Sequence, residues 1–131
     1  MRGAKVLAGT LAVNRAAFGL NYLVRPQEAR STWIGGIAKV PSVQVMVRSQ
    51  GVRDVVLGAG ALRALVRGDD RELRAWVAGH AVCDLADAVA TWAARRRLPK
   101  QRRRLALVVA GASTVVGAAA AAGLRPGPAT D

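Results

Sequence analysis

The chain is poor in the residues that build disulfides, metal centres and aromatic cores. It contains one cysteine, Cys83, and one histidine, His80. A single cysteine excludes an intramolecular disulfide and a metal centre built from several thiolates. Aromatic residues make up 4% of the chain, so a soluble core would consist mainly of Ala, Val and Leu. Small residues are instead what membrane helices use to bring their backbones close together.

Acidic residues are also scarce, because eight Asp and Glu accompany twenty Lys and Arg, for a formal net charge of +12. Such an excess suggests nucleic-acid binding, in which phosphate neutralisation dominates. The distribution disfavours that partner, because most basic residues cluster in short segments between apolar stretches and no aromatic residues interleave with the run Arg95–Arg104. We therefore expect no nucleic-acid binding, and we expect the basic residues to attract anionic lipid headgroups.

What the chain does have is a charge-free stretch, residues 105–124, directly after the basic run Arg95–Arg104. Twenty helical residues at about 1.5 Å each cover the hydrocarbon core of a bilayer, which is about 30 Å thick. A dense basic segment beside such a stretch is typical of a cytoplasmic loop. The pair predicts an integral membrane protein.

Proline and glycine divide the remaining chain into three further apolar segments. Together they predict an all-α fold, a four-helix transmembrane bundle with up-down-up-down connectivity. Trp76 and Trp92 fall near the two ends of the third predicted helix, as in an aromatic belt, and Trp33 and Ile34 are expected at headgroup depth in the segment before the second. The predicted single domain, 1–131, contains helices at 5–24, 42–66, 71–94 and 105–124, a short interfacial segment at 27–40 and a disordered tail at 125–131.

Ionisable residues inside the first three segments leave a soluble, basic helical bundle open as the alternative. Each charge at a bilayer centre costs about 2.5 to 3.5 kcal/mol on insertion scales. Their depth favours the membrane, because antiparallel helices joined by short turns would place these polar residues at one level. The expected polar layer, which we treat as the candidate binding site, contains Asn14, Arg15, Arg48, Arg53, Asp54, His80, Asp84, Asp87, Ser113 and Thr114.

Helical periodicity indicates that this layer faces inward. His80, Asp84 and Asp87 share one face of the third helix, and Arg48 and Asp54 share a small and polar face of the second. On the first helix, the expected stripe is Asn14, Phe18 and Asn21, with Arg15 at its edge. Arg15, Arg48 and Arg53 would balance Asp54, Asp84 and Asp87. We predict that Arg53 pairs with Asp84 or, failing that, with Asp87.

Several roles are open for the layer. Ion pairs could fix helix order and register, or the layer could form a binding pocket or ion path at the midplane. A metal site would lack a second His, and a catalytic His80–aspartate pair would lack a nucleophile other than Ser113 or Thr114. We therefore expect no metal and no catalytic residue, and the sequence identifies no cofactor. The expected function is a non-enzymatic binding or structural membrane module; the alternative is a proton- or ion-coupled small-molecule carrier subunit, or a membrane enzyme using His80, Asp84 and Asp87.

The fourth helix carries small residues at a spacing of four, Ser113, Gly117 and Ala121. This spacing permits close packing either within the monomer or across a homodimer. The sequence leaves both arrangements open.

The chain resembles a family of small bacterial four-helix membrane proteins of unknown function, loosely grouped with DoxX-like proteins. The resemblance rests on segments 15–19, 33–35 and 48–58 and on the paired Asp84 and Asp87. It covers residues 5–124 and implies a multi-pass protein of the bacterial inner membrane, without a reaction or ligand. The basic loops at 25–40 and 95–104 predict that both termini lie outside the cytoplasm.

Overall fold

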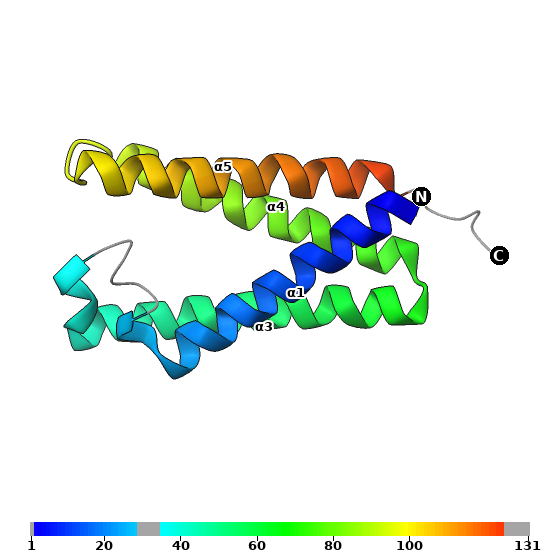
Figure 1. Ribbon diagram of the computed structural model, residues 1–131, viewed down its shortest axis with the longest axis horizontal. Helices are drawn as coiled ribbons and strands as arrows, with labels where there is room; N and C mark the ends of the chain where they lie inside the picture. Colours follow the sequence, from blue (N-terminus) through cyan, green and yellow to red (C-terminus); the bar gives the residue numbers. More distant parts are fainter. Residues whose placement is uncertain (1, 29–34, 125–131) are drawn as a thin grey trace.

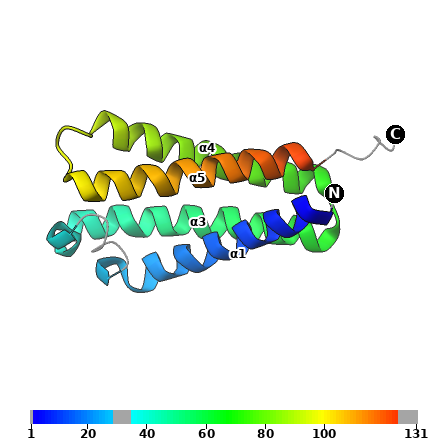
Figure 2. The same ribbon diagram turned by 45° about the horizontal axis from the view of Figure 1, so that its top comes forward.

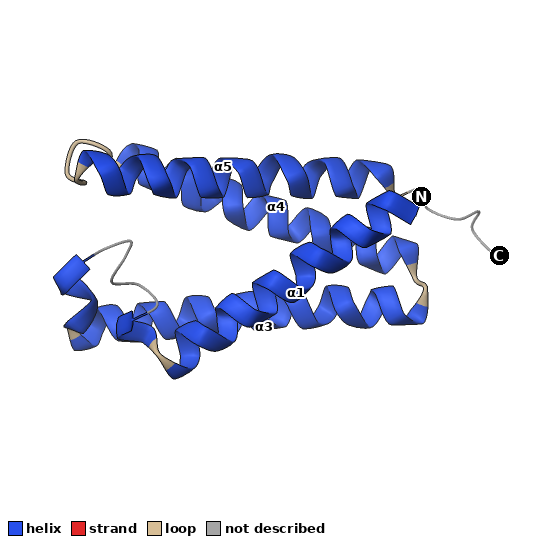
Figure 3. Cartoon of the chain, viewed as in Figure 1, coloured by secondary structure: helices blue, strands red, loops and turns tan. Residues whose placement is uncertain are grey.

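The computed structural model describes residues 2–28 and 35–124, and this part of the chain is helical without strands (Figure 3). The expected positions of Trp33 and Ile34 at headgroup depth, and the disordered tail at 125–131, lie outside the described residues. The elements are α1 (Arg2–Val24), a 3-10 helix η1 (Gly35–Lys39), α3 (Pro41–Arg67), α4 (Asp70–Ala93) and α5 (Lys100–Gly123). The predicted all-α class is therefore correct.

The four long helices run alternately up and down and form two hairpins, α1 with α3 and α4 with α5 (Figures 1 and 2). Contact between the hairpins is made mainly by α3 with α4 and, to a smaller extent, by α1 with α5. The hairpins converge at the end that contains the α3–α4 turn, which we call the closed end. They diverge toward the end that contains the α4–α5 loop, which we call the open end (Figure 1).

Local sequence signals explain the helix ends. Pro41 begins α3, and Gly68 ends it in the left-handed conformation, with φ of 71°. The Asp69 side chain then caps α4 by accepting a hydrogen bond of 2.8 Å from the Glu72 backbone N–H. Helix α5 begins at Lys100, directly after Pro99 and five residues before the predicted start at 105. The basic residues of its first turns extend the helix, because Lys, Gln and Arg have high helix propensity.

The α1–α3 hairpin depends on glycine. A Cβ added to Gly19 would lie 2.7 Å from the Gly51 carbonyl oxygen, and one added to Gly58 would lie 2.7 Å from the Ala12 carbonyl oxygen. These contacts are with backbone atoms, so a side chain at either glycine would force the two helices apart. Small residues thus set the distance between α1 and α3, as in closely packed membrane helices.

The hydrophobic core occupies the closed end. Its buried side chains come from all four long helices and are mostly alanine, with three larger residues, Leu73, Val77 and Leu124. The alanines are Ala8, Ala12, Ala61, Ala64, Ala120 and Ala121. This cluster fixes the helix ends on one side and leaves the middle of the bundle to polar residues.

Large apolar side chains point outward along every long helix. Phe18, Met46, Val82 and Val108, one from each, are between 59% and 70% exposed. Of the described helices, only α5 is both apolar enough and long enough to cross a membrane. Helices α1, α3 and α4 are less apolar, in part because they carry the charged residues that are buried at the middle of the bundle.

Candidate functional site

Arg15 projects from the buried stripe of α1 into the middle of the bundle. Asn14, by contrast, is exposed, as are Phe18 and Asn21. The prediction that Asn14, Phe18 and Asn21 form the buried face of α1 was therefore wrong. Each of them precedes a residue of the observed buried face, and one residue corresponds to a rotation of about 100° around the helix. The buried positions recur every three or four residues and carry Ala8, Ala12, Gly19 and Tyr22.

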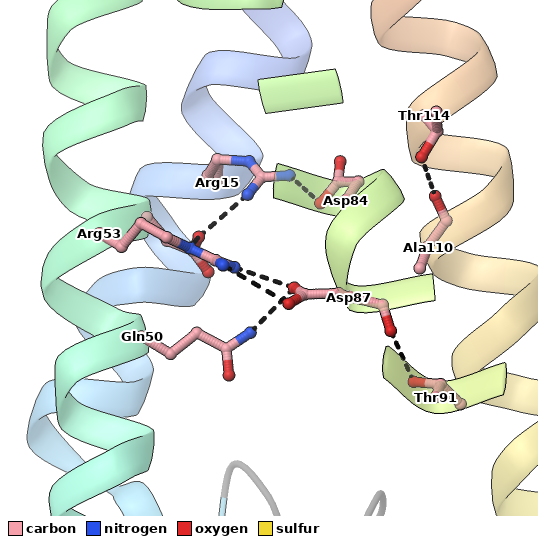
Figure 4. A network of polar contacts seen from close by, with 9 residues as sticks. Arg15, Gln50, Arg53, Asp84, Asp87, Thr91, Ala110 and Thr114 are labelled. Atoms are coloured by element: carbon pink, nitrogen blue, oxygen red, sulfur yellow. Dashed lines mark hydrogen bonds and ion pairs between the residues drawn. The ribbon is translucent and has the colours of Figure 1, made fainter. Parts of the chain in front are cut away.

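Arg15 joins the two helix hairpins through a pair of carboxylates (Figure 4). One terminal nitrogen, Nη1, donates to Asp54 Oδ1 of α3 at 2.9 Å, and the other, Nη2, donates to Asp84 Oδ1 of α4. The three side chains are 9% to 13% exposed. Because one guanidinium contacts carboxylates on both neighbouring helices, it fixes α1, α3 and α4 at a common depth.

Arg53 forms a second, more exposed part of the same network. Its Nε donates to Asp54 Oδ1 at 3.3 Å, and its Nη2 donates to Asp87 Oδ2 at 2.9 Å. Gln50, one turn earlier on α3, donates to Asp87 Oδ2 at 3.4 Å. Gln50 was not among the predicted site residues, although its spacing of three and four residues from Arg53 and Asp54 places it beside them.

The preferred partner of Arg53 was predicted incorrectly. Asp84 is bound by Arg15, and Arg53 instead takes the second predicted partner, Asp87. Arg53 precedes Asp54 and is therefore rotated by about 100° around α3, which brings its guanidinium to the edge of the layer. Asp87, with a side chain 41% exposed, lies at that edge.

Arg48 lies outside the network, contrary to prediction. Its side chain is exposed, and it has no ion pair within the described residues. The buried face of α3 is centred on Val47, Gly51 and Asp54, so Arg48 is one residue out of phase. The expected balance of three arginines against three aspartates is therefore wrong. Only two guanidinium groups, those of Arg15 and Arg53, pair with the three carboxylates of the layer.

His80 lies on the α4 face that carries Asp84, one helical turn away. Its side chain is 2% exposed, and neither Nδ1 nor Nε2 has a hydrogen-bond partner within the described part of the chain. The Leu57 backbone faces the ring without hydrogen-bond geometry. Among the described residues, no three His, Cys, Asp or Glu side chains gather closely enough to hold a metal ion. A buried imidazole with unused nitrogens is available to a ligand instead.

The two hydroxyl residues of α5 differ in orientation. Ser113 faces the interior between the hairpins, whereas the Thr114 hydroxyl donates to the Ala110 carbonyl of its own helix at 2.8 Å (Figure 4). Neither residue forms a described hydrogen bond with His80.

A cavity of about 430 Å³ lies between the two hairpins. The charged network and His80 form its polar wall, and small apolar residues of α5 form the opposite wall. It extends from the level of Leu11 and Gly117 toward the open end, where Tyr22, Thr91 and Ala106 line it. Of the predicted site residues, the lining includes Asn14, Arg15, Arg53, Asp54, His80, Asp84, Asp87 and Ser113.

Comparison with known proteins identifies a family but no function. Neither the curated proteins nor the solved structures contain a match to this chain. One family model, described as a domain of unknown function, DUF4267, matches residues 12–124. The matched region contains every charged residue of the network and nearly the whole four-helix fold. The expectation of a family of unknown function is therefore confirmed, and the chain belongs to the DUF4267 family.

Proposed function

We propose that the protein is a multi-pass membrane module, without enzymatic activity, that binds a small molecule in the cavity between its two helix hairpins. The observation that carries the proposal is the cavity itself, which reaches a buried ion network and an imidazole with two unused nitrogens. Its volume of about 430 Å³ is within the range of small-molecule sites, about 300 to 1,000 Å³.

The distribution of side chains supports a position within the bilayer. At the level of the ion network, Arg15, Asp54 and Asp84 face inward while Phe18, Val52 and Leu85 are more than half exposed. Water would favour the opposite arrangement, because exposed apolar side chains lose the hydrophobic contribution to folding and buried charges lose hydration. A lipid environment removes the first disadvantage, and pairing reduces the second.

The basic residues at the open end support contact with anionic headgroups and a cytoplasmic position for that end. The Arg95 guanidinium lies 4.5 Å from the centre of the Trp92 ring, and Trp92 is 58% exposed. An exposed tryptophan beside clustered arginines is typical of a membrane–water interface. The bacterial inner-membrane location and the grouping with DoxX-like proteins stay predictions, as does a homodimer through α5.

Thiol labelling tests the membrane location and the topology together. With Cys83 replaced by serine, the variants Gly3→Cys and Gln101→Cys each carry one exposed thiol, at the closed and open ends. In intact bacterial cells, an impermeant maleimide should label position 3 and should label position 101 only after permeabilisation. The reverse pattern would contradict the orientation. A chain found in the soluble fraction would contradict the membrane proposal.

Native mass spectrometry of the protein extracted from membranes tests ligand binding. The wild type should carry a bound small molecule, and Ala110→Trp should lose it, because Ala110 lines the cavity and an indole would fill the space. Ala112→Trp is the matched control, since Ala112 is exposed and lies outside the lining. An unliganded wild type, or the same adduct on both variants, would contradict binding in this cavity.

A further inference from the structure

We infer that the cavity binds organic cations with an aromatic or aliphatic body, and that each bound cation displaces one proton from the Asp84–His80 end of the ion network. This inference rests on the proposed small-molecule function and names the ligand class of the same site. Three observations carry it. The network has a net negative charge, its three carboxylates accept different numbers of hydrogen bonds, and the opposite wall of the cavity is apolar.

The charges of the network do not cancel. Arg15 from α1 and Arg53 from α3 contribute two positive charges, whereas Asp54 from α3 and Asp84 and Asp87 from α4 contribute three negative charges. With His80 neutral, one negative charge is left over. Helix α5 contributes no titratable residue to the lining. An unpaired charge is expensive inside a protein surrounded by hydrocarbon, and this cost favours the uptake of either a proton or a ligand cation.

The surplus charge belongs at Asp84. Asp54 accepts hydrogen bonds from two arginines, and Asp87 accepts them from Arg53 and Gln50. Among the described contacts, Asp84 accepts from Arg15 alone. His80 lies one turn away, buried and without a hydrogen-bond partner, at the same inner end of the cavity. Asp84 and His80 therefore have the fewest hydrogen bonds from protein donors, and we expect an exchangeable proton to bind there.

The remaining walls suit the body of a lipophilic cation. Tyr22, the buried aromatic residue of α1, lines the cavity, and α5 presents Ala106, Val109 and Ala110. Aromatic faces attract organic ammonium groups, and aliphatic walls accept an apolar body. An anion is disfavoured, because both guanidinium groups already bind carboxylates.

The exchange is a simple proton transfer. When the cation enters at low pH, the O–H bond of the Asp84 carboxyl group breaks and the proton passes to water. The site keeps the same net charge before and after the exchange. No covalent bond to the ligand forms, and no electron is transferred. Exchange of this kind is what the coupled-carrier alternative would require, although cation binding alone does not need transport.

Calorimetric titration of the purified full chain in detergent micelles tests the inference with three probes of similar size. They are the permanent cation benzyltrimethylammonium, its uncharged isostere neopentylbenzene, and the anion benzenesulfonate. We expect binding of the cation alone. Comparison of two buffers with different ionisation enthalpies should show release of close to one proton per cation at low pH. The affinity should rise about tenfold per pH unit while the proton is held, because proton and cation compete.

Two variants remove the surplus charge in independent ways. Asp84→Asn deletes it, and Val109→Lys adds a tethered ammonium group on the opposite wall without breaking an ion pair. Both should weaken cation binding by more than about tenfold and abolish proton release. Gln101→Lys, which adds an ammonium group at an exposed position outside the cavity lining, should keep both.

The outcomes separate this inference from the proposed function. Cation binding without proton release, or cation binding unchanged in both charge variants, would overturn the exchange. Binding of the isostere or the anion in place of the cation would overturn the ligand class and leave small-molecule binding intact. Failure of all three probes to bind would overturn the inference, while the mass-spectrometric comparison of Ala110→Trp with the wild type decides the proposed function separately.

Discussion

Replacing Arg15 with methionine is expected to lower the free energy of unfolding by about 3 to 5 kcal/mol. Arg15 is the shared partner of Asp54 and Asp84, and its removal leaves Asp84 without a described ion pair. A buried carboxylate without a partner is strongly destabilising, because it has lost water and gained nothing in exchange. Unfolding in SDS, followed by the circular dichroism of the helices, measures the effect in mixed micelles.

Arg48→Met is the matched control for this prediction. Arg48 is also a helical arginine of the central region, but it is exposed and has no ion pair in the described structure. Its replacement should change stability by no more than about 0.5 kcal/mol. Equal effects of the two substitutions would show that the Arg15 network contributes nothing specific to stability.

Removal of both partners separates a structural role from a functional one. Arg15→Met combined with Asp84→Leu leaves Asp54 paired with Arg53 and leaves Arg53 bound to Asp87. Replacing a buried ion pair by apolar groups of similar size is often neutral, so most of the lost stability should return. A stable double variant that retains the bound small molecule would make the pair a structural feature. A stable double variant without it would place the pair in the binding site.

The depth of the polar residues could be predicted from the sequence, because it depends only on the number of residues between each of them and the nearest turn. In antiparallel helices joined by short turns, equal distances from a turn give equal depth, and this brings Asp54 and Asp84 to the level of Arg15. The bounds of α3 and α4 were equally accessible, because proline, glycine and a capping aspartate mark them locally. The start of α5 was missed by five residues, because its first turns are basic and not apolar.

The partners within the layer could not be predicted, because they depend on helix rotation. One residue corresponds to about 100° around the axis, so a small error in phase exchanges an inward and an outward position. That error placed Asn14 and Arg48 on buried faces and assigned Asp84 to Arg53. The rotation of α1 and α3 is set by glycine contacts with backbone, and no charge pattern in the sequence reports them.

Gly58→Ala tests this dependence on backbone contact, with an expected loss of about 1 to 3 kcal/mol in the free energy of unfolding. The new Cβ would lie 2.7 Å from the Ala12 carbonyl oxygen and 2.8 Å from the Ala16 backbone nitrogen. Helix α1 must therefore move away from α3. Arg15 lies between Ala12 and Ala16 in sequence, so the movement also shifts its guanidinium relative to Asp54.

Two further substitutions distinguish this mechanism from a general effect of alanine. Gly111→Ala, on α5, has no neighbour within 4 Å of the added Cβ, so it should be neutral or should stabilise by up to about 1 kcal/mol through helix propensity. Adding Ala16→Gly to Gly58→Ala removes only the contact with the Ala16 Cβ, at 2.9 Å, and leaves the two closer backbone contacts. Recovery should therefore be small. Full recovery would mean that side-chain crowding, and not the approach of the two backbones, limits the distance between α1 and α3.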